Sequence, residues 1–143
     1  MKRRIEKAAV LGAGTMGARI AAHLANAGLP CILLDIVPPD LPAGAPAGAR
    51  NKIVRAGLDA AKKARPAAFF HASLAERIVT GNFEDDLGRL GEADWIIEAV
   101  AENLEIKRNL LARVAAHRKP GAIVTTNTSG LPVRLIADRK SVV

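Results

Sequence analysis

The chain has 143 residues, a length that predicts one domain with enough buried surface for a hydrophobic core. Hydrophobic residues make up 50% of the sequence and charged residues 24%, a globular composition that excludes the disordered, collagen-like and disulfide-scaffold classes. The net charge of +7 suits a solvated basic surface or an anionic ligand, but the lack of Tyr leaves few aromatic rings for base stacking and argues against nucleic acid.

The first half of the chain alternates short apolar runs with helical patterns and turn signals. In chain order it predicts a strand over 7–11, a helix over 16–27, a strand over 31–35, a loop over 37–48 and a basic helix over 49–64. The strand over 31–35 reads CILLD, and a run that is apolar without alternation predicts burial on both faces, as in a parallel sheet.

The second half continues this alternation. It predicts a short helix over 73–78 with Ser73 as N-cap, a short strand over 79–80, a helical turn over 86–90, a strand over 95–99, a helix over 103–117, a strand over 122–126 and a helix over 132–137. The helix over 103–117 carries apolar side chains at helical spacing, namely Ile106, Leu110, Leu111 and Val114. The whole pattern predicts an α/β fold with a doubly wound, mainly parallel sheet, formed by one domain over residues 1–143.

The first predicted strand leads into a turn with the pattern G-x-G-x-x-G, made of Gly12, Ala13, Gly14, Thr15, Met16 and Gly17. A strand before the turn and a helix opening inside it are the context of a dinucleotide-binding fingerprint in a Rossmann-type fold. Gly12 permits the tight turn, Gly14 lets the backbone approach a pyrophosphate, and Gly17 lets the helix pack close to the strand. The alternative is a strand–helix turn that binds no ligand.

Asp35 ends the second predicted strand, eighteen residues after Gly17. A carboxylate at this position accepts hydrogen bonds from both adenosine ribose hydroxyls and repels the 2′-phosphate of NADP. Ile36 follows it, and no Arg stands there to hold such a phosphate. We therefore predict NAD as the cofactor, with Asp35 and Ile36 at its ribose; the alternative is an Asp that starts a Pro-rich turn.

Two polar segments follow the later strands, at the edge where an open parallel sheet forms its ligand crevice. Glu102 and Lys107 are predicted near the nicotinamide half of the cofactor. The alternative is that Glu102 complements the helix dipole and Lys107 is a solvated cation. Asn127 and Ser129 are predicted to hydrogen-bond a carboxamide or a substrate oxygen, and the alternative is a capping turn before Pro132.

The other reactive side chains predict neither a metal site nor a disulfide. His23, His71 and His117 stand far apart in the sequence, without the spacing of metal ligands. Cys31 is the only cysteine, which favours a reducing compartment.

Nothing in the sequence predicts export or a membrane. The basic start at Arg3 and Arg4 imitates a secretory signal, but Glu6 and Lys7 interrupt the apolar region that such a signal needs. No apolar run approaches the roughly 20 residues that span a bilayer. We therefore expect a soluble, cytoplasmic protein.

Four motifs together resemble the N-terminal half of L-3-hydroxyacyl-CoA dehydrogenases. They are GAGTMG at 12–17, LLD at 33–35, IIEAVAENLEIK at 96–107 and TTNTSGLPV at 125–133. The resemblance runs from about residue 7 to residue 137, and four motifs in order are much more specific than the glycine pattern alone. It implies a chain that binds NAD for oxidation of the 3-hydroxyl of an acyl-CoA in fatty-acid β-oxidation.

The resemblance also implies roles for individual residues. The turn from Gly12 to Gly17 would hold the pyrophosphate, and Asp35 the adenosine ribose. Along the cofactor it places Ala101, Glu102 and Lys107. Ser129 would reach both nicotinamide and substrate in a supporting catalytic role, and Lys63 is the nearest match to a lysine that contacts CoA in the family.

The sequence lacks several features of the family pattern, among them its catalytic His. In the family the general base is a His in an HFFNP segment beyond the NTS motif, a Glu orients it, and a helical domain completes the acyl-CoA site and the dimer interface. None of these occurs within the 143 residues. We therefore expect that this chain alone is inactive and that a homodimer forms through that helical domain. The alternatives are another NAD-dependent 3-hydroxy acid dehydrogenase and a stand-alone NAD-binding regulatory module.

Overall fold

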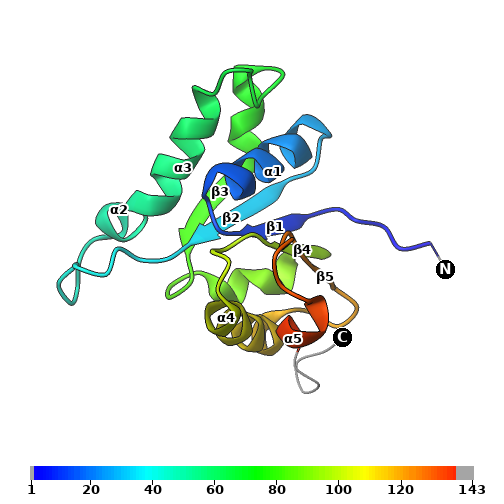
Figure 1. Ribbon diagram of the computed structural model, residues 1–143. Coiled ribbons are helices and arrows are strands. Elements are labelled where there is room, and N and C mark those ends of the chain that lie inside the picture. The colour runs from blue at the N-terminus through cyan, green and yellow to red at the C-terminus, as the bar shows by residue number, and fades with distance from the viewer. Residues whose placement is uncertain (1, 138–143) are drawn as a thin grey trace.

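The computed structural model describes residues 2–137, which form a five-stranded parallel sheet between two layers of helices (Figure 1). In chain order the elements are β1 (Ala8–Leu11), α1 (Thr15–Asn26), β2 (Cys31–Asp35), α2 (Ala47–Arg50), α3 (Lys52–Lys62), the 3-10 helix η1 (Ala72–Arg77), β3 (Ile78–Asn82), the 3-10 helix η2 (Leu87–Glu92), β4 (Trp95–Glu98), α4 (Leu104–His117), β5 (Ile123–Thr126) and α5 (Val133–Ile136). The strands lie in the order β3-β2-β1-β4-β5, and every neighbouring pair is parallel. This order confirms the predicted doubly wound, Rossmann-type sheet.

The central strand β1 contributes to two hydrophobic clusters, one on each face of the sheet. Ala8 and Val10 pack with α1 and α3, whereas Ala9 and Leu11 pack with η2 and α4. None of these four side chains has exposed surface. The absence of polar alternation in the sequence of β1 follows from this burial on both faces.

Two glycines bring helices into contact with the loop between β1 and α1. A Cβ atom on Gly17 would lie 1.7 Å from the Gly12 carbonyl oxygen, and one on Gly57 of α3 would lie 2.0 Å from the Ala13 carbonyl oxygen. Both distances are far below van der Waals contact, so only glycine fits at either position. The sequence predicted the role of Gly17 but not that of Gly57, because the contact of α3 with this loop is tertiary.

The N-terminus of η1 differs from the prediction. His71 is the N-cap, and its Nδ1 accepts a hydrogen bond from the Ser73 backbone N–H at 3.2 Å. The Ser73 hydroxyl is itself 2.7 Å from that nitrogen. The prediction that Ser73 caps the helix is therefore wrong, because a ring nitrogen two residues earlier already occupies the capping position.

Asp94, just before β4, joins three segments at the amino edge of the sheet. Its Oδ2 accepts hydrogen bonds from the backbone N–H groups of Glu6 (2.8 Å) and Lys7 (3.1 Å), and its Oδ1 lies 2.5 Å from Lys119 Nζ. The hydrogen bond from Lys119, followed by those from the two backbone N–H groups, lowers the pKa of Asp94 to about 2. The ionised carboxylate therefore stabilises the folded chain.

We expect Asp94→Asn to lower the melting temperature at neutral pH. Because the pKa of Asp94 is depressed to about 2 in the folded chain, its contribution is complete above the unfolded pKa of about 4 and is lost as the pH falls toward 2. The difference in melting temperature between variant and wild type, followed by circular dichroism, should shrink below about pH 4. The exposed Asp59→Asn is the control; an Asp94→Asn difference that does not change with pH would contradict the assignment.

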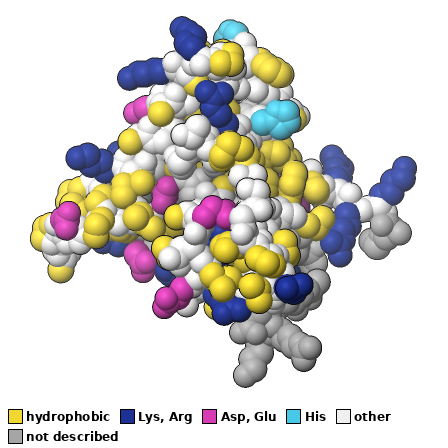
Figure 2. All heavy atoms as spheres, in the orientation of Figure 1, with side chains coloured by type: hydrophobic (Ala, Val, Ile, Leu, Met, Phe, Trp, Pro, Cys, Tyr) yellow, Lys and Arg dark blue, Asp and Glu magenta, His cyan; other side chains and the backbone are white. Residues whose placement is uncertain are grey.

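The surface carries charges of both signs. On the face in Figure 2, Lys and Arg side chains are spread over the top, the lower part and the right of the view, with several together on the right, and they do not form one continuous patch. Among residues 2–137, no helix has the length and apolar character needed to cross a bilayer.

Candidate functional site

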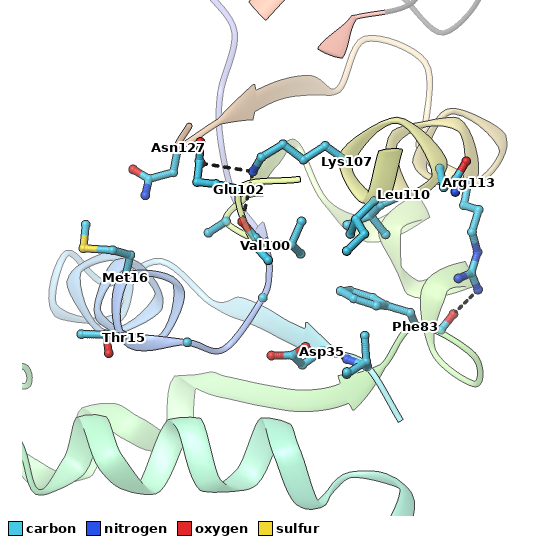
Figure 3. A pocket seen from close by; sticks show the side chains of 17 residues that line it. Thr15, Met16, Asp35, Phe83, Val100, Glu102, Lys107, Leu110, Arg113 and Asn127 are labelled. Carbon is cyan, nitrogen blue, oxygen red and sulfur yellow. Dashed lines mark hydrogen bonds and ion pairs between the residues drawn. The ribbon is translucent and has the colours of Figure 1, made fainter. Parts of the chain in front are cut away.

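A cavity of about 770 Å³ lies at the carboxyl edge of the sheet, between α1 and α4 (Figure 3). Asp35, at the end of β2, lines one part of the cavity, and Asn127, after β5, lines another. Ten of the thirteen residues that the sequence assigned to the cofactor line it: Gly12, Gly14, Thr15, Met16, Asp35, Ile36, Ala101, Glu102, Lys107 and Asn127. The volume suits a cofactor-sized ligand.

The glycine turn leaves room for an anionic group. Gly12 has φ +105°, and a Cβ there would lie 2.6 Å from the Ala99 carbonyl oxygen. A Cβ on Gly14 would meet nothing within 4 Å, so the space above it is open. Gly14 is also the N-cap of α1, and no side chain caps the helix. The positive end of the helix dipole therefore faces open space, which suits a pyrophosphate.

Asp35 is half-buried, and both of its carboxylate oxygens already hold backbone groups. Oδ2 accepts a hydrogen bond from the Ala13 N–H at 2.7 Å, and Oδ1 accepts one from the Ile36 N–H at 2.7 Å. An ionised carboxylate has about four acceptor positions, so two remain for the hydroxyls of a ribose. The first of these bonds also fixes the glycine turn against the end of β2.

Three of the assigned residues do not line this cavity. Ala13 and Gly17 instead stabilise the glycine turn. The Ala13 N–H donates to Asp35, and Gly17 packs against the Gly12 carbonyl group. Ala13 also lines a second cavity of about 300 Å³ between α1 and α3. Ser129 is exposed in the turn after β5.

Lys107 is fully buried (0% exposed) although it is charged. Its Nζ donates hydrogen bonds to Glu98 Oε1 at 2.7 Å and to the Val100 carbonyl oxygen at 3.0 Å. The alternative of a solvated cation is therefore wrong. A buried ammonium is tolerated here because an equally buried carboxylate neutralises it.

Glu102 lies at the surface and bridges two segments. Its Oε2 accepts a hydrogen bond from the Thr128 hydroxyl at 2.6 Å, and its Oε1 is 3.6 Å from Lys107 Nζ. The hydrogen bond from Thr128, aided by the charge of Lys107, lowers the pKa of Glu102. An ionised Glu102 thus ties the start of α4 to the turn that carries Ser129.

Several residues that line the cavity were missed by sequence reasoning. They are Phe83, Ala99, Val100, Ile106, Asn109, Leu110 and Arg113. Four of these residues lie on α4 at helical spacing: Ile106, Asn109, Leu110 and Arg113. They share one face of the helix, so helical periodicity in the sequence was a signal that could have identified them. Arg113 lies beside Phe83 in Figure 3 and donates to the Phe83 carbonyl oxygen at 2.8 Å.

Other candidate reactive groups do not reach this cavity. His23, His71 and His117 are exposed and are not among its lining residues. Within residues 2–137, no group of three or more His, Cys, Asp or Glu side chains is arranged to hold a metal ion. Burial raises the pKa of the Cys31 thiol to about 12, so this thiol stays protonated at neutral pH.

Comparison with known proteins gives consistent matches. "Probable 3-hydroxyacyl-CoA dehydrogenase" of Deinococcus radiodurans is 49% identical over 96% of this chain, and "Putative fatty acid oxidation complex trifunctional enzyme" of Rickettsia felis is 34% identical over 96%. The crystal structure of 3-hydroxybutyryl-CoA dehydrogenase from Escherichia coli K12 superimposes with a TM-score of 0.73, at 28% identity over 96% of this chain. The chain spans only 38%, 18% and 27% of these three proteins, respectively.

The family comparison identifies the domain. Residues 7–141 match the model of the 3-hydroxyacyl-CoA dehydrogenase NAD binding domain. This match confirms the resemblance found in the sequence and the predicted cofactor, NAD. The open space above Gly14, the unshared acceptor positions of Asp35 and the size of the cavity fit that cofactor. The chain belongs to the family of 3-hydroxyacyl-CoA dehydrogenase NAD-binding domains.

Proposed function

We propose that this chain serves as the NAD-binding domain of an enzyme that oxidises L-3-hydroxyacyl-CoA to 3-oxoacyl-CoA in fatty-acid β-oxidation. The observation that carries the proposal is one cavity lined by Asp35, Gly14 and Asn127. The names of its relatives, which include a fatty acid oxidation complex protein, support the substrate class.

The proposal assigns each part of the cavity to a part of the cofactor. Asp35 and Ile36 hold the adenosine ribose, and the turn around Gly14 holds the pyrophosphate. Lys107, Glu102 and the segment from Asn127 to Ser129 surround the nicotinamide. Bound NAD supplies the hydride acceptor in its nicotinamide ring.

The same reaction needs a proton acceptor for the substrate hydroxyl. Ser129 can hold that hydroxyl, but no His lines the cavity. We propose that the acceptor is the family's His, in an HFFNP segment beyond the NTS motif, and that a separate helical domain completes the acyl-CoA site and a homodimer interface. The cytoplasm is the proposed location, because a single cysteine, Cys31, favours a reducing compartment.

We expect NADH to bind at least about tenfold more tightly than NADPH, a difference of about 1.4 kcal/mol. The reason is that the carboxylate of Asp35 accepts ribose hydroxyls and repels a 2′-phosphate. Titration of nicotinamide fluorescence with each nucleotide measures the two dissociation constants. Equal affinities for the two nucleotides, or tighter binding of NADPH, would contradict the assignment of Asp35 to the adenosine ribose.

A pair of variants sharpens this test. Asp35→Ala should reduce the preference for NADH, because the repulsion is removed. Asp40→Ala is the matched control, since Asp40 is an exposed acid in the following loop and does not line the cavity. No NADH binding by the wild-type chain would contradict the proposed function itself.

A further inference from the structure

The carboxylate of Glu98 joins three segments that meet beside the cavity. Oε1 accepts hydrogen bonds from Lys107 Nζ on α4 at 2.7 Å and from the Val100 N–H in the turn after β4 at 2.8 Å. Oε2 accepts a hydrogen bond from the Thr126 hydroxyl at the end of β5. The Glu98 backbone carbonyl also accepts a hydrogen bond from the Asn127 N–H at 2.8 Å. One residue thus fixes the turn, the helix and the strand end.

Stability alone does not account for this arrangement. Glu98 and Lys107 are both 0% exposed, and removing two charges from water carries a large free-energy cost before their attraction is counted. An apolar pair of similar volume would often serve the fold equally well. The Glu98–Lys107 pair instead fixes the relative positions of three segments, because the carboxylate of Glu98 accepts hydrogen bonds from all three.

The segments that Glu98 fixes all belong to one part of the cavity. Val100, Lys107 and Asn127 line it, whereas Glu98 itself does not. Figure 3 shows Lys107, Glu102 and Asn127 close together and Asp35 well apart from them. Glu98 therefore does not border the space that a cofactor would occupy, and it can act on that space only through these neighbours.

We propose that Glu98 is the positioning residue for the nicotinamide half of the cofactor. The inference rests on the proposed function, which assigns that half to Lys107 and Asn127. Glu98 holds the Lys107 ammonium against the Val100 carbonyl and aligns the end of β5 with the start of α4. Without its charge, the nicotinamide subsite loosens while the adenosine subsite at Asp35 stays intact.

The test compares two ligands on Glu98→Gln. NADH fills the whole cavity, whereas ADP-ribose contains the adenosine, pyrophosphate and second ribose but no nicotinamide. We expect the variant to bind NADH about fivefold more weakly and ADP-ribose within about twofold of wild type, because one charge-assisted network is lost at one end only. Fluorescence titration measures NADH, and displacement calorimetry measures ADP-ribose.

Each outcome decides the proposal. An equal loss for both ligands means that Glu98 supports only the general fold, and no loss for NADH means that it positions nothing; both overturn the inference. The control is Glu92→Gln, because Glu92 is an exposed acid that pairs with Lys7 and lies outside the cavity. Failure of wild-type NADH binding would instead reject the proposed function.

A second variant covers the case in which Glu98→Gln does not fold. Thr126→Val leaves the buried ion pair intact and removes a hydroxyl that donates to Glu98 and also accepts a hydrogen bond from the Thr128 N–H at 3.2 Å. It should show the same pattern, with NADH binding weakened about twofold to threefold and ADP-ribose binding unchanged. If Thr126→Val binds both ligands with wild-type affinity, the proposed role of Glu98 in positioning the end of β5 is overturned.

Discussion

Gly14→Val is expected to abolish dinucleotide binding and leave a folded chain. A Cβ on Gly14 meets no protein atom within 4 Å, and the residue has φ −67° and ψ −173°, which a Val side chain tolerates. The added side chain fills the space where a pyrophosphate approaches the N-terminus of α1. We expect the affinity for NADH to fall by at least about 100-fold, or about 2.7 kcal/mol.

Calorimetry measures the loss of binding, and circular dichroism checks the fold. Gly88→Val is the matched control, because a Cβ on Gly88 also meets nothing within 4 Å and Gly88 lies in η2, outside the cavity. Retained NADH affinity in a folded Gly14→Val chain would show that the glycine turn serves only the fold.

The second large effect concerns turnover: the 143-residue chain should bind NADH yet oxidise no 3-hydroxyacyl-CoA above background. Loss of a general base typically removes 10²–10⁴-fold in rate, and an incomplete acyl-CoA site removes substrate positioning as well. A serine hydroxyl without a basic partner is a poor proton acceptor at neutral pH, and no His lines the cavity that residues 2–137 form. His117 ends α4, roughly 20 Å from Glu102 at 1.5 Å per residue, so it does not reach the nicotinamide subsite.

The assay is NADH production at 340 nm with 3-hydroxybutyryl-CoA and with a long-chain analogue. A parallel NADH titration shows that the same preparation binds cofactor, so that inactivity is not a failure to fold. Robust turnover by the pure chain would place the proton acceptor within these residues and would contradict the assignment.

The sequence predicted the sheet well because its signals are local. The continuous apolar runs of β1 and β2 report burial on both faces of a parallel sheet, and glycines mark the turns between elements. The cavity lies where the strands end, so Asp35, the last residue of β2, and Asn127, the residue after β5, could be placed at that edge from the sequence.

The buried face of α4 shows why other features could not be predicted. The buried stripe of α4 is Lys107, Leu110 and Val114. Sequence reasoning placed Ile106 on that face because it is apolar, yet Ile106 is 49% exposed. Sequence reasoning can place Lys107 in the core only if its partner carboxylate is known, and that carboxylate, Glu98, lies on β4. The burial of Lys107 therefore depends on a tertiary ion pair, which the periodicity of α4 does not reveal.

The hydrogen bond from the Ala13 N–H to Asp35 limits how this domain can evolve toward NADP. A single exchange of Asp35 for a neutral residue would remove the repulsion but would also leave that backbone N–H without its acceptor, so the turn would loosen as selectivity relaxed. An efficient change of nucleotide therefore takes at least two coordinated substitutions, one that provides a cation for the phosphate and one that restores an acceptor for Ala13. We therefore expect a variant with only one of the two substitutions to bind NADPH weakly and NADH less tightly than the wild-type chain does.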